Sequence, residues 1–182
     1  MTTQQIFPPR AFTDYDKIAT AADAAGEVIA LLHQRGIANK NVGFFVVIDA
    51  ERSVGRPGMP LWQSALLYEG AWGIPRVDWE PGWIYDDIAR AKAYLSWRER
   101  MDTLELVTMH PERLRGDDVR YPGGIYRHPF VIAFSGIQAR LDHAVAGILY
   151  EVLRGIAGIQ AETTFTQMAQ ERLAFIPEST GS

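Results

Sequence analysis

Side chains that could do chemistry gather around one apolar run in the second half of the sequence. The run is FVIAFSG, residues 130–136, and the polar residues on its two flanks are Tyr121, Arg127, His128, Arg140, Asp142 and His143. Histidine titrates nearest neutral pH, and the planar fork of arginine matches a carboxylate. The sequence predicts a site in which either His143 or His128 moves a proton and arginine holds an anion.

Two further groups of acids allow alternative interpretations. Asp142 adjoins His143, and a carboxylate that orients an imidazole is a common general-base arrangement. Neighbouring helix residues diverge by about 100°, so these two side chains are not expected to face each other. Tyr85 precedes Asp86 and Asp87, which could serve acid–base catalysis or simply place negative charge at a helix start.

Aromatic residues are clustered in the middle of the chain: Trp62, Tyr68, Trp72, Trp79, Trp83, Tyr85 and Trp97. Such a set predicts either a flat apolar wall for a planar ligand or a contact surface for another chain. As a wall, Trp62, Trp72, Trp79 and Trp83 would bind a ligand together with Arg127, Arg140 and Tyr121. Flat walls and arginine together suggest a small aromatic or unsaturated carboxylate.

Several classes of chemistry lack support in the sequence. The chain has no cysteine, its four histidines have no metal-ligand spacing, and no nucleotide-binding glycine motif follows a strand. We therefore expect no metal and no cofactor, and a lyase, hydratase or isomerase step by acid–base chemistry, for example on a hydroxylaminobenzoate.

The net charge of −4 with scattered basic residues speaks against nucleic acid as a partner. Without an apolar segment of about 18 residues or a signal peptide, we expect a cytoplasmic protein with no membrane partner.

The periodicity of the sequence predicts an α+β fold. Helices are expected over 14–35, 84–102 and 138–156. Thr13 is the expected N-cap of the first helix. In the second helix, Lys92 is expected to be exposed and the residues expected to face inward are Ile84, Ile88, Ala91 and Leu95. Strands are expected over 41–49 and 128–136, with a third possible at Ser53–Val54. Residues 61–72 fit a short helix or an irregular strand, 70–83 are mostly loop, and 103–109 form a strand or a helix end.

The expected organisation is an arm over 1–12, one domain over 13–160 with an aromatic-rich insertion at 61–83, and a C-terminal segment over 161–182 that forms a short helix or a frayed tail. This order of elements does not fit a doubly wound parallel sheet. A small antiparallel sheet flanked by helices fits better.

Four stretches, YPGGIY, FVIAFSGIQARLDHAVAGIL, VGFFVVIDAERSV and IARAKAYLSW, resemble in content and order the GlcG/HbpS group of small domains. The resemblance implies a profilin-like antiparallel sheet with packed helices, an oligomer, and haem binding or haem degradation as the alternative function, with His128 or His143 on the iron. It also allows a non-catalytic accessory subunit. Where that group carries an R-x-D-G-A type motif, this chain has GRPGMPLW.

Overall fold

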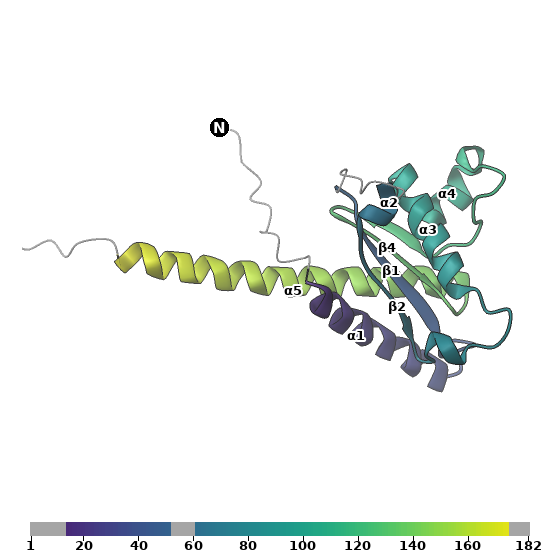
Figure 1. Ribbon diagram of the computed structural model, residues 1–182, viewed down its shortest axis with the longest axis horizontal. Coiled ribbons are helices and arrows are strands. Elements are labelled where there is room, and N and C mark those ends of the chain that lie inside the picture. Colours follow the sequence, from purple (N-terminus) through teal and green to yellow (C-terminus); the bar gives the residue numbers. More distant parts are fainter. Residues whose placement is uncertain (1–13, 52–60, 175–182) are drawn as a thin grey trace, which may run out of the picture.

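A four-stranded antiparallel sheet with the order β2-β1-β4-β3 lies at the centre of the protein (Figure 1). The computed structural model describes residues 14–51 and 61–174. The strands are β1 (Gly43–Asp49), β2 (Leu66–Trp72), β3 (Gly124–Arg127) and β4 (Phe130–Ser135). Antiparallel strands between flanking helices confirm the predicted α+β, profilin-like fold.

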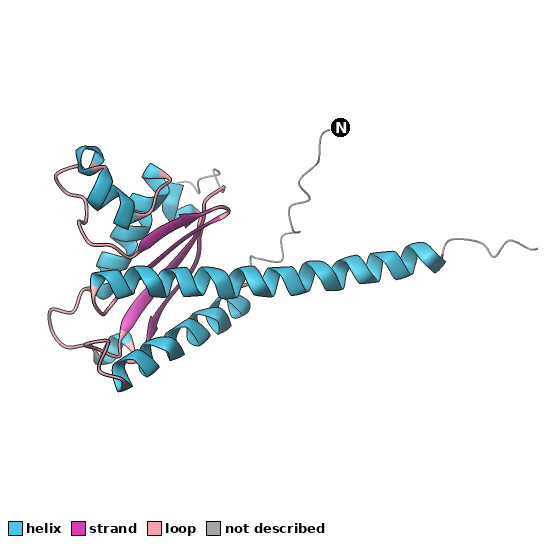
Figure 2. Ribbon diagram, turned by 180° about the vertical axis from the view of Figure 1, so that it is seen from behind, coloured by secondary structure: helices cyan, strands magenta, loops and turns pink. Residues whose placement is uncertain are grey.

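Helices cover both faces of the sheet (Figure 2). On one face lie α1 (Tyr15–Gln34) and α5 (Ala139–Ala174), and on the other lies α3 (Tyr85–Glu99). Alternate residues of β4 divide between the two cores: Phe130, Ile132 and Phe134 face α1 and α5, whereas Val131 and Ala133 face α3. A strand that is buried on both faces explains the uninterrupted apolar run in the sequence.

The first helix agrees with its prediction except at its N-terminus. The Asp14 carboxylate, rather than Thr13, caps it and accepts a hydrogen bond from the Asp16 amide at 3.2 Å, and Thr13 lies outside the described residues. At the other end Gly36 has φ = +70°, as expected of a glycine just after a helix.

Both alternatives predicted for residues 61–72 occur in succession. Leu61–Ser64 form the short helix α2, and Leu66–Trp72 form β2, an edge strand of the sheet. The loop to Tyr85 contains one 3-10 turn, Arg76–Asp78. Part of the segment expected as an insertion therefore completes the sheet. The possible strand at Ser53–Val54 falls outside the described residues.

The chain after α3 folds differently from either prediction. Residues Thr103–Met109 form a separate helix, α4, because Arg100 adopts a left-handed conformation with φ = +53° and ends α3. A 3-10 turn, Pro111–Arg113, follows. The inward face predicted for α3 is correct only in part: Leu95 is buried, but Ile84 and Ala91 are exposed, and Lys92, predicted to be exposed, is fully buried.

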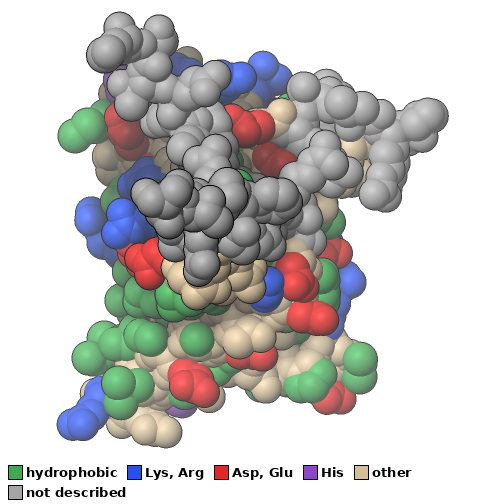
Figure 3. Space-filling view, turned by 90° about the vertical axis from the view of Figure 1, so that its left-hand side faces the viewer, with side chains coloured by type: hydrophobic (Ala, Val, Ile, Leu, Met, Phe, Trp, Pro, Cys, Tyr) green, Lys and Arg blue, Asp and Glu red, His purple; other side chains and the backbone are tan. Residues whose placement is uncertain are grey.

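Helix α5 is longer than predicted and projects beyond the sheet (Figures 1 and 2). It continues unbroken through residue 160 to Ala174. Its first half buries Val145, Leu149 and Leu153 against the sheet and α1, whereas Ile159 and Phe165 are exposed. On the side toward which α5 projects, acidic and basic side chains are mixed with hydrophobic ones (Figure 3).

Candidate functional site

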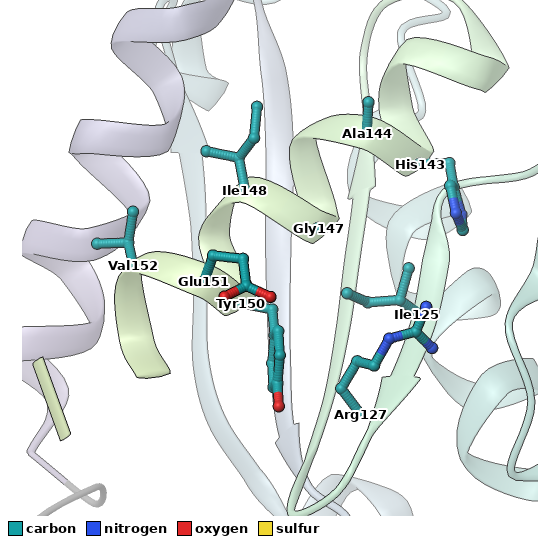
Figure 4. A pocket seen from close by; sticks show the side chains of 9 residues that line it. All are labelled: Ile125, Arg127, His143, Ala144, Gly147, Ile148, Tyr150, Glu151 and Val152. Atoms are coloured by element: carbon teal, nitrogen blue, oxygen red, sulfur yellow. The ribbon is translucent and has the colours of Figure 1, made fainter. Parts of the chain in front are cut away.

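An open groove of about 610 Å³ runs between the edge strand β3 and the first half of α5. The small residues Ala144 and Gly147 of α5 are part of its lining, and a methyl group added at Gly147 would meet open space. The lining residues are Ile125, Arg127, His143, Ala144, Gly147, Ile148, Tyr150, Glu151 and Val152 (Figure 4). Apolar side chains thus form most of its walls, with polar groups at particular points.

Arg127 stands at the end of β3 and is held by Asp102. Its two terminal nitrogens donate to the two carboxylate oxygens at 2.6 and 2.7 Å, and one of them also donates to the Tyr126 carbonyl at 2.9 Å. A guanidinium has five N–H groups, so two of them have no partner among the described residues. The pair fixes Arg127 in place and leaves donors for an anionic ligand.

Asp102 and Thr103 also cover the outer edge of β3. The Thr103 hydroxyl accepts from the Gly124 amide at 2.9 Å and donates to the Gly124 carbonyl at 3.1 Å. The Asp102 carboxylate accepts from the Tyr126 amide at 2.8 Å. The sequence pattern gave no reason to single out Asp102, because its role depends on a strand edge that is distant along the chain.

His143 is half-buried at the end of the groove near Arg127 (Figure 4). Its Nε2 lies 4.0 Å from an oxygen of Asp102, and its buried Nδ1 has no hydrogen-bond partner in the described part of the chain. Burial is the largest influence on the pKa of His143 and lowers it; Asp102 raises it in part, and Arg127 lowers it again. The imidazole is therefore neutral near pH 7, the form that accepts a proton or binds a metal.

Asp142 points away from His143, as the helix geometry predicted. Its carboxylate lies 2.7 Å from the Lys92 ammonium and accepts the Ile137 amide at 3.1 Å. Lys92 also donates to the Phe134 carbonyl at 3.1 Å. Burial lowers the pKa of Lys92 and raises that of Asp142, and the attraction between the two groups opposes both shifts. This buried pair joins α3 to the end of β4 and the start of α5.

Gly123 makes the buried pair possible. It has φ = +132°, and a methyl group at this position would lie 2.7 Å from the Lys92 ammonium and 2.6 Å from the Phe134 carbonyl. A glycine adopts this positive φ without the steric cost that other residues would pay.

Three other predicted site residues lie outside the groove lining. His128 is in the turn between β3 and β4, and the peptide bond between His128 and Pro129 is cis. The Nε2 atom of His128 lies 2.6 Å from a Glu51 oxygen. Tyr121 and Arg140 are exposed.

The structure separates the tryptophans from the groove. Trp72 packs on the face of the sheet that carries α1 and α5, where Gly26 leaves room for its ring. Trp62 and Trp79 pack on the opposite face, with α3. No tryptophan lines the groove, so the described residues do not form the expected single pocket of tryptophans, arginine and histidine.

Tyr85 takes part in a separate aromatic cluster beside α3. Its hydroxyl accepts from the Lys40 ammonium at 2.6 Å, and its ring lies 5.4 Å from the rings of both Trp79 and Trp83. The Lys40 ammonium also lies 4.9 Å from the centre of the Trp83 ring. These cation–π contacts connect the loop after β2 to the body of the domain.

A second groove of about 620 Å³ lies on the α3 side of β2. It is lined by Trp62, Gln63, Leu66, Glu69, Asp87, Arg90, Ala91 and Tyr94. Arg90 contacts the two Glu69 oxygens at 2.9 and 3.1 Å and Asp86 at 3.0 Å, which raises the pKa of Arg90.

Two further properties concern metals and membranes. Within residues 14–51 and 61–174, no group of three or more histidine, aspartate or glutamate side chains could hold a metal ion. The Ala139–Gln170 part of α5 is long and apolar enough to cross a membrane by length and composition alone. Its first half is packed against the sheet.

Two solved structures are similar to this chain. The crystal structure of the Klebsiella pneumoniae protein ORFY, described with the family model DUF336, matches 85% of this chain and 97% of its own with 14% identity and a TM-score of 0.50. A PduOC:heme complex matches 74% of this chain and 91% of its own with 17% identity and a TM-score of 0.46. No family model and no curated protein matches the chain. The similarity to the ORFY protein agrees with the fold that the resemblance of the sequence implied.

Proposed function

We propose that the groove between β3 and α5 binds a flat, apolar ligand that carries a carboxylate, with haem as the first candidate. The observation that carries the proposal is His143: a neutral imidazole at the wall of an apolar groove, with one nitrogen that lacks a partner among the described residues. A histidine imidazole is a common ligand of haem iron; because Nδ1 is buried, the ring of His143 would have to turn to present a nitrogen to the groove.

Each part of haem has a counterpart in the groove. Ile125 would contact the ring, and His143 would take the iron. Arg127 would donate its two unused N–H groups to a propionate, while Asp102 keeps its guanidinium in place. Bound haem would supply the ligand-binding and redox chemistry of its iron.

A haemin titration of the purified chain tests this proposal through the Soret band. We expect saturable binding in the micromolar range that His143→Ala abolishes and that Arg127→Gln weakens about 10-fold or more, the loss expected for a charge-assisted hydrogen bond. His128→Ala and His110→Ala are the matched controls and should bind like the parent. Equal binding by all variants, or no saturable Soret change, would contradict the proposal.

The proximity of Asp102 to His143 favours a second candidate, acid–base catalysis on a small aromatic carboxylate. Arg127 would hold the carboxylate, and the neutral imidazole would take a proton in a lyase, hydratase or isomerase step. The test is a panel of benzoate-type acids, including hydroxylaminobenzoates, assayed for binding and for product. Turnover of one acid that His143→Ala abolishes, with no haemin binding, would replace the first candidate by the second.

A further inference from the structure

One side of α5 borders the groove between β3 and α5, and its residues recur at helical spacing. His143, Gly147 and Tyr150 follow one another at steps of four and three residues, so they share one side of the helix. Figure 4 shows the side chains of His143 and Tyr150 on this side, whereas those of Ala144 and Ile148 point to the other side. At about 1.5 Å per residue, the step from His143 to Tyr150 covers about 10 Å along the helix.

Gly147 leaves the surface of the helix bare between the rings of His143 and Tyr150. A methyl group added at Gly147 would find no neighbouring atom within 4 Å. The same residue is part of the groove lining. The space above Gly147 is therefore open to a ligand, and a larger side chain at this position would fill it.

Tyr150 supplies a flat surface to the groove. Ile148 and Val152 also line it, but their side chains extend toward the opposite side of the helix from Tyr150 (Figure 4). This leaves Ile125 and Tyr150 as the large apolar side chains of the described residues that face the groove. Aromatic side chains pack favourably against other flat rings, so Tyr150 is suited to contact a planar ligand.

We propose that Gly147 and Tyr150 determine the length of the ligand, whose flat body lies across Gly147. Tyr150 would contact this body at one end of the groove, and Arg127 and His143 would hold its polar groups at the other end. The inference rests on the proposed function of the groove and adds a requirement to it, because the ligand must reach both ends.

This requirement distinguishes between the two candidate ligands. A benzoate held by Arg127 has a single small ring and is too short to lie across Gly147 and contact Tyr150 as well. A macrocycle such as haem is long enough. The groove volume of about 610 Å³ also lies within the range of pockets that enclose large organic ligands. Gly147 and Tyr150 therefore select a ligand of haem size.

The test is a haemin titration, followed through the Soret band, of variants that change the gap or the flat surface. Gly147→Leu fills the gap, and Gly155→Leu is its matched control, at another open glycine of α5 that does not line the groove. Tyr150→Leu removes the aromatic ring and Tyr150→Phe keeps it, with the exposed Tyr121→Leu as control. Denaturant unfolding of each variant shows whether the fold is intact.

We expect Gly147→Leu to weaken haemin binding about 10-fold or more and Tyr150→Leu about 5-fold or more, which is the loss of one good packing contact. Tyr150→Phe and the two control variants should bind like the parent. The unfolding midpoint of Gly147→Leu should be no lower than that of the parent, because leucine favours a helix more than glycine does and the added methyl group meets no atom. Loss of binding would then be separate from loss of folding.

Two outcomes would overturn this inference and leave a ligand-binding groove in place. One is haemin binding by the parent that neither Gly147→Leu nor Tyr150→Leu weakens relative to its control. The other is a parent chain that binds a benzoate but not haemin. A parent chain that binds neither ligand would overturn the proposed function, and this inference with it.

Discussion

The buried pair of Lys92 and Asp142 gives the sharpest prediction about stability. Lys92→Met keeps the length of the side chain but leaves the Asp142 carboxylate buried without its cation, at a site where both side chains are at most 4% exposed. Removal of one partner of a buried ion pair costs about 3–5 kcal/mol. For a domain of this size, this loss corresponds to a fall in Tm of roughly 6–20 °C.

The loss should depend on pH, and the direction follows from Asp142. Without Lys92, the pKa of Asp142 in the folded state lies still further above its value in the unfolded chain. The cost is therefore complete where the carboxylate is ionised in the folded protein, and it shrinks as falling pH protonates it. Lys92→Met should be closer to the parent in stability at mildly acidic pH than at alkaline pH.

The assay is denaturant unfolding followed by tryptophan fluorescence, with two comparison variants. Lys92→Met/Asp142→Asn removes both charges and keeps an oxygen to accept the Ile137 amide, so it should recover much of the loss. Lys17→Met breaks only an exposed pair with Asp14 at 3.5 Å and should cost less than about 1 kcal/mol. The reasoning is refuted if Lys92→Met loses no more than Lys17→Met, or if the double variant is no more stable than Lys92→Met.

Three other predictions use the same unfolding assay. Thr103→Val removes both hydrogen bonds to Gly124 and should cost about 1–3 kcal/mol; hydrogen exchange should quicken at the Gly124 amide and not in β1. Gly123→Ala places a methyl group against the buried pair and should lower the free energy of unfolding by more than about 2 kcal/mol. Gly158→Ala, in an open part of α5, should instead raise the free energy of unfolding by a few tenths to about 1 kcal/mol. Burial lowers the pKa of His143, so the unfolded chain takes up its proton first and stability falls as pH drops below about 6.5. His143→Gln should flatten that decline, and an unchanged slope would contradict the assignment.

The elements that sequence periodicity located well are those with one large apolar stripe or a doubly buried run. α1, β1, β4 and the first half of α5 are of this kind. The face of α3 was predicted only in part because, apart from Leu95, its buried side consists of small or polar residues such as Ala89, Lys92, Ala93 and Ser96. Hydrophobic periodicity does not detect a helix face that packs closely through small side chains.

The site was predicted in part. Arg127 and His143 do line one groove, whereas the tryptophans share neither this groove nor one face of the sheet. Adjacency in sequence suggested one aromatic wall, but Trp72 packs on the face of the sheet that carries α1 and α5, whereas Trp62, Trp79 and Trp97 pack on the face that carries α3. Asp102 could be identified only after the strand edge that it covers was known.

The projecting half of α5 affects how unfolding must be measured. From Gly158 to Gln170 no residue is buried, and an isolated helix of that length is marginal in water. Far-ultraviolet circular dichroism would record this part melting before the domain, whereas all five tryptophans precede residue 98 and would not sense it. Two probes would then give different transitions, the usual sign of a folding intermediate, even for a globular part that unfolds in a single step.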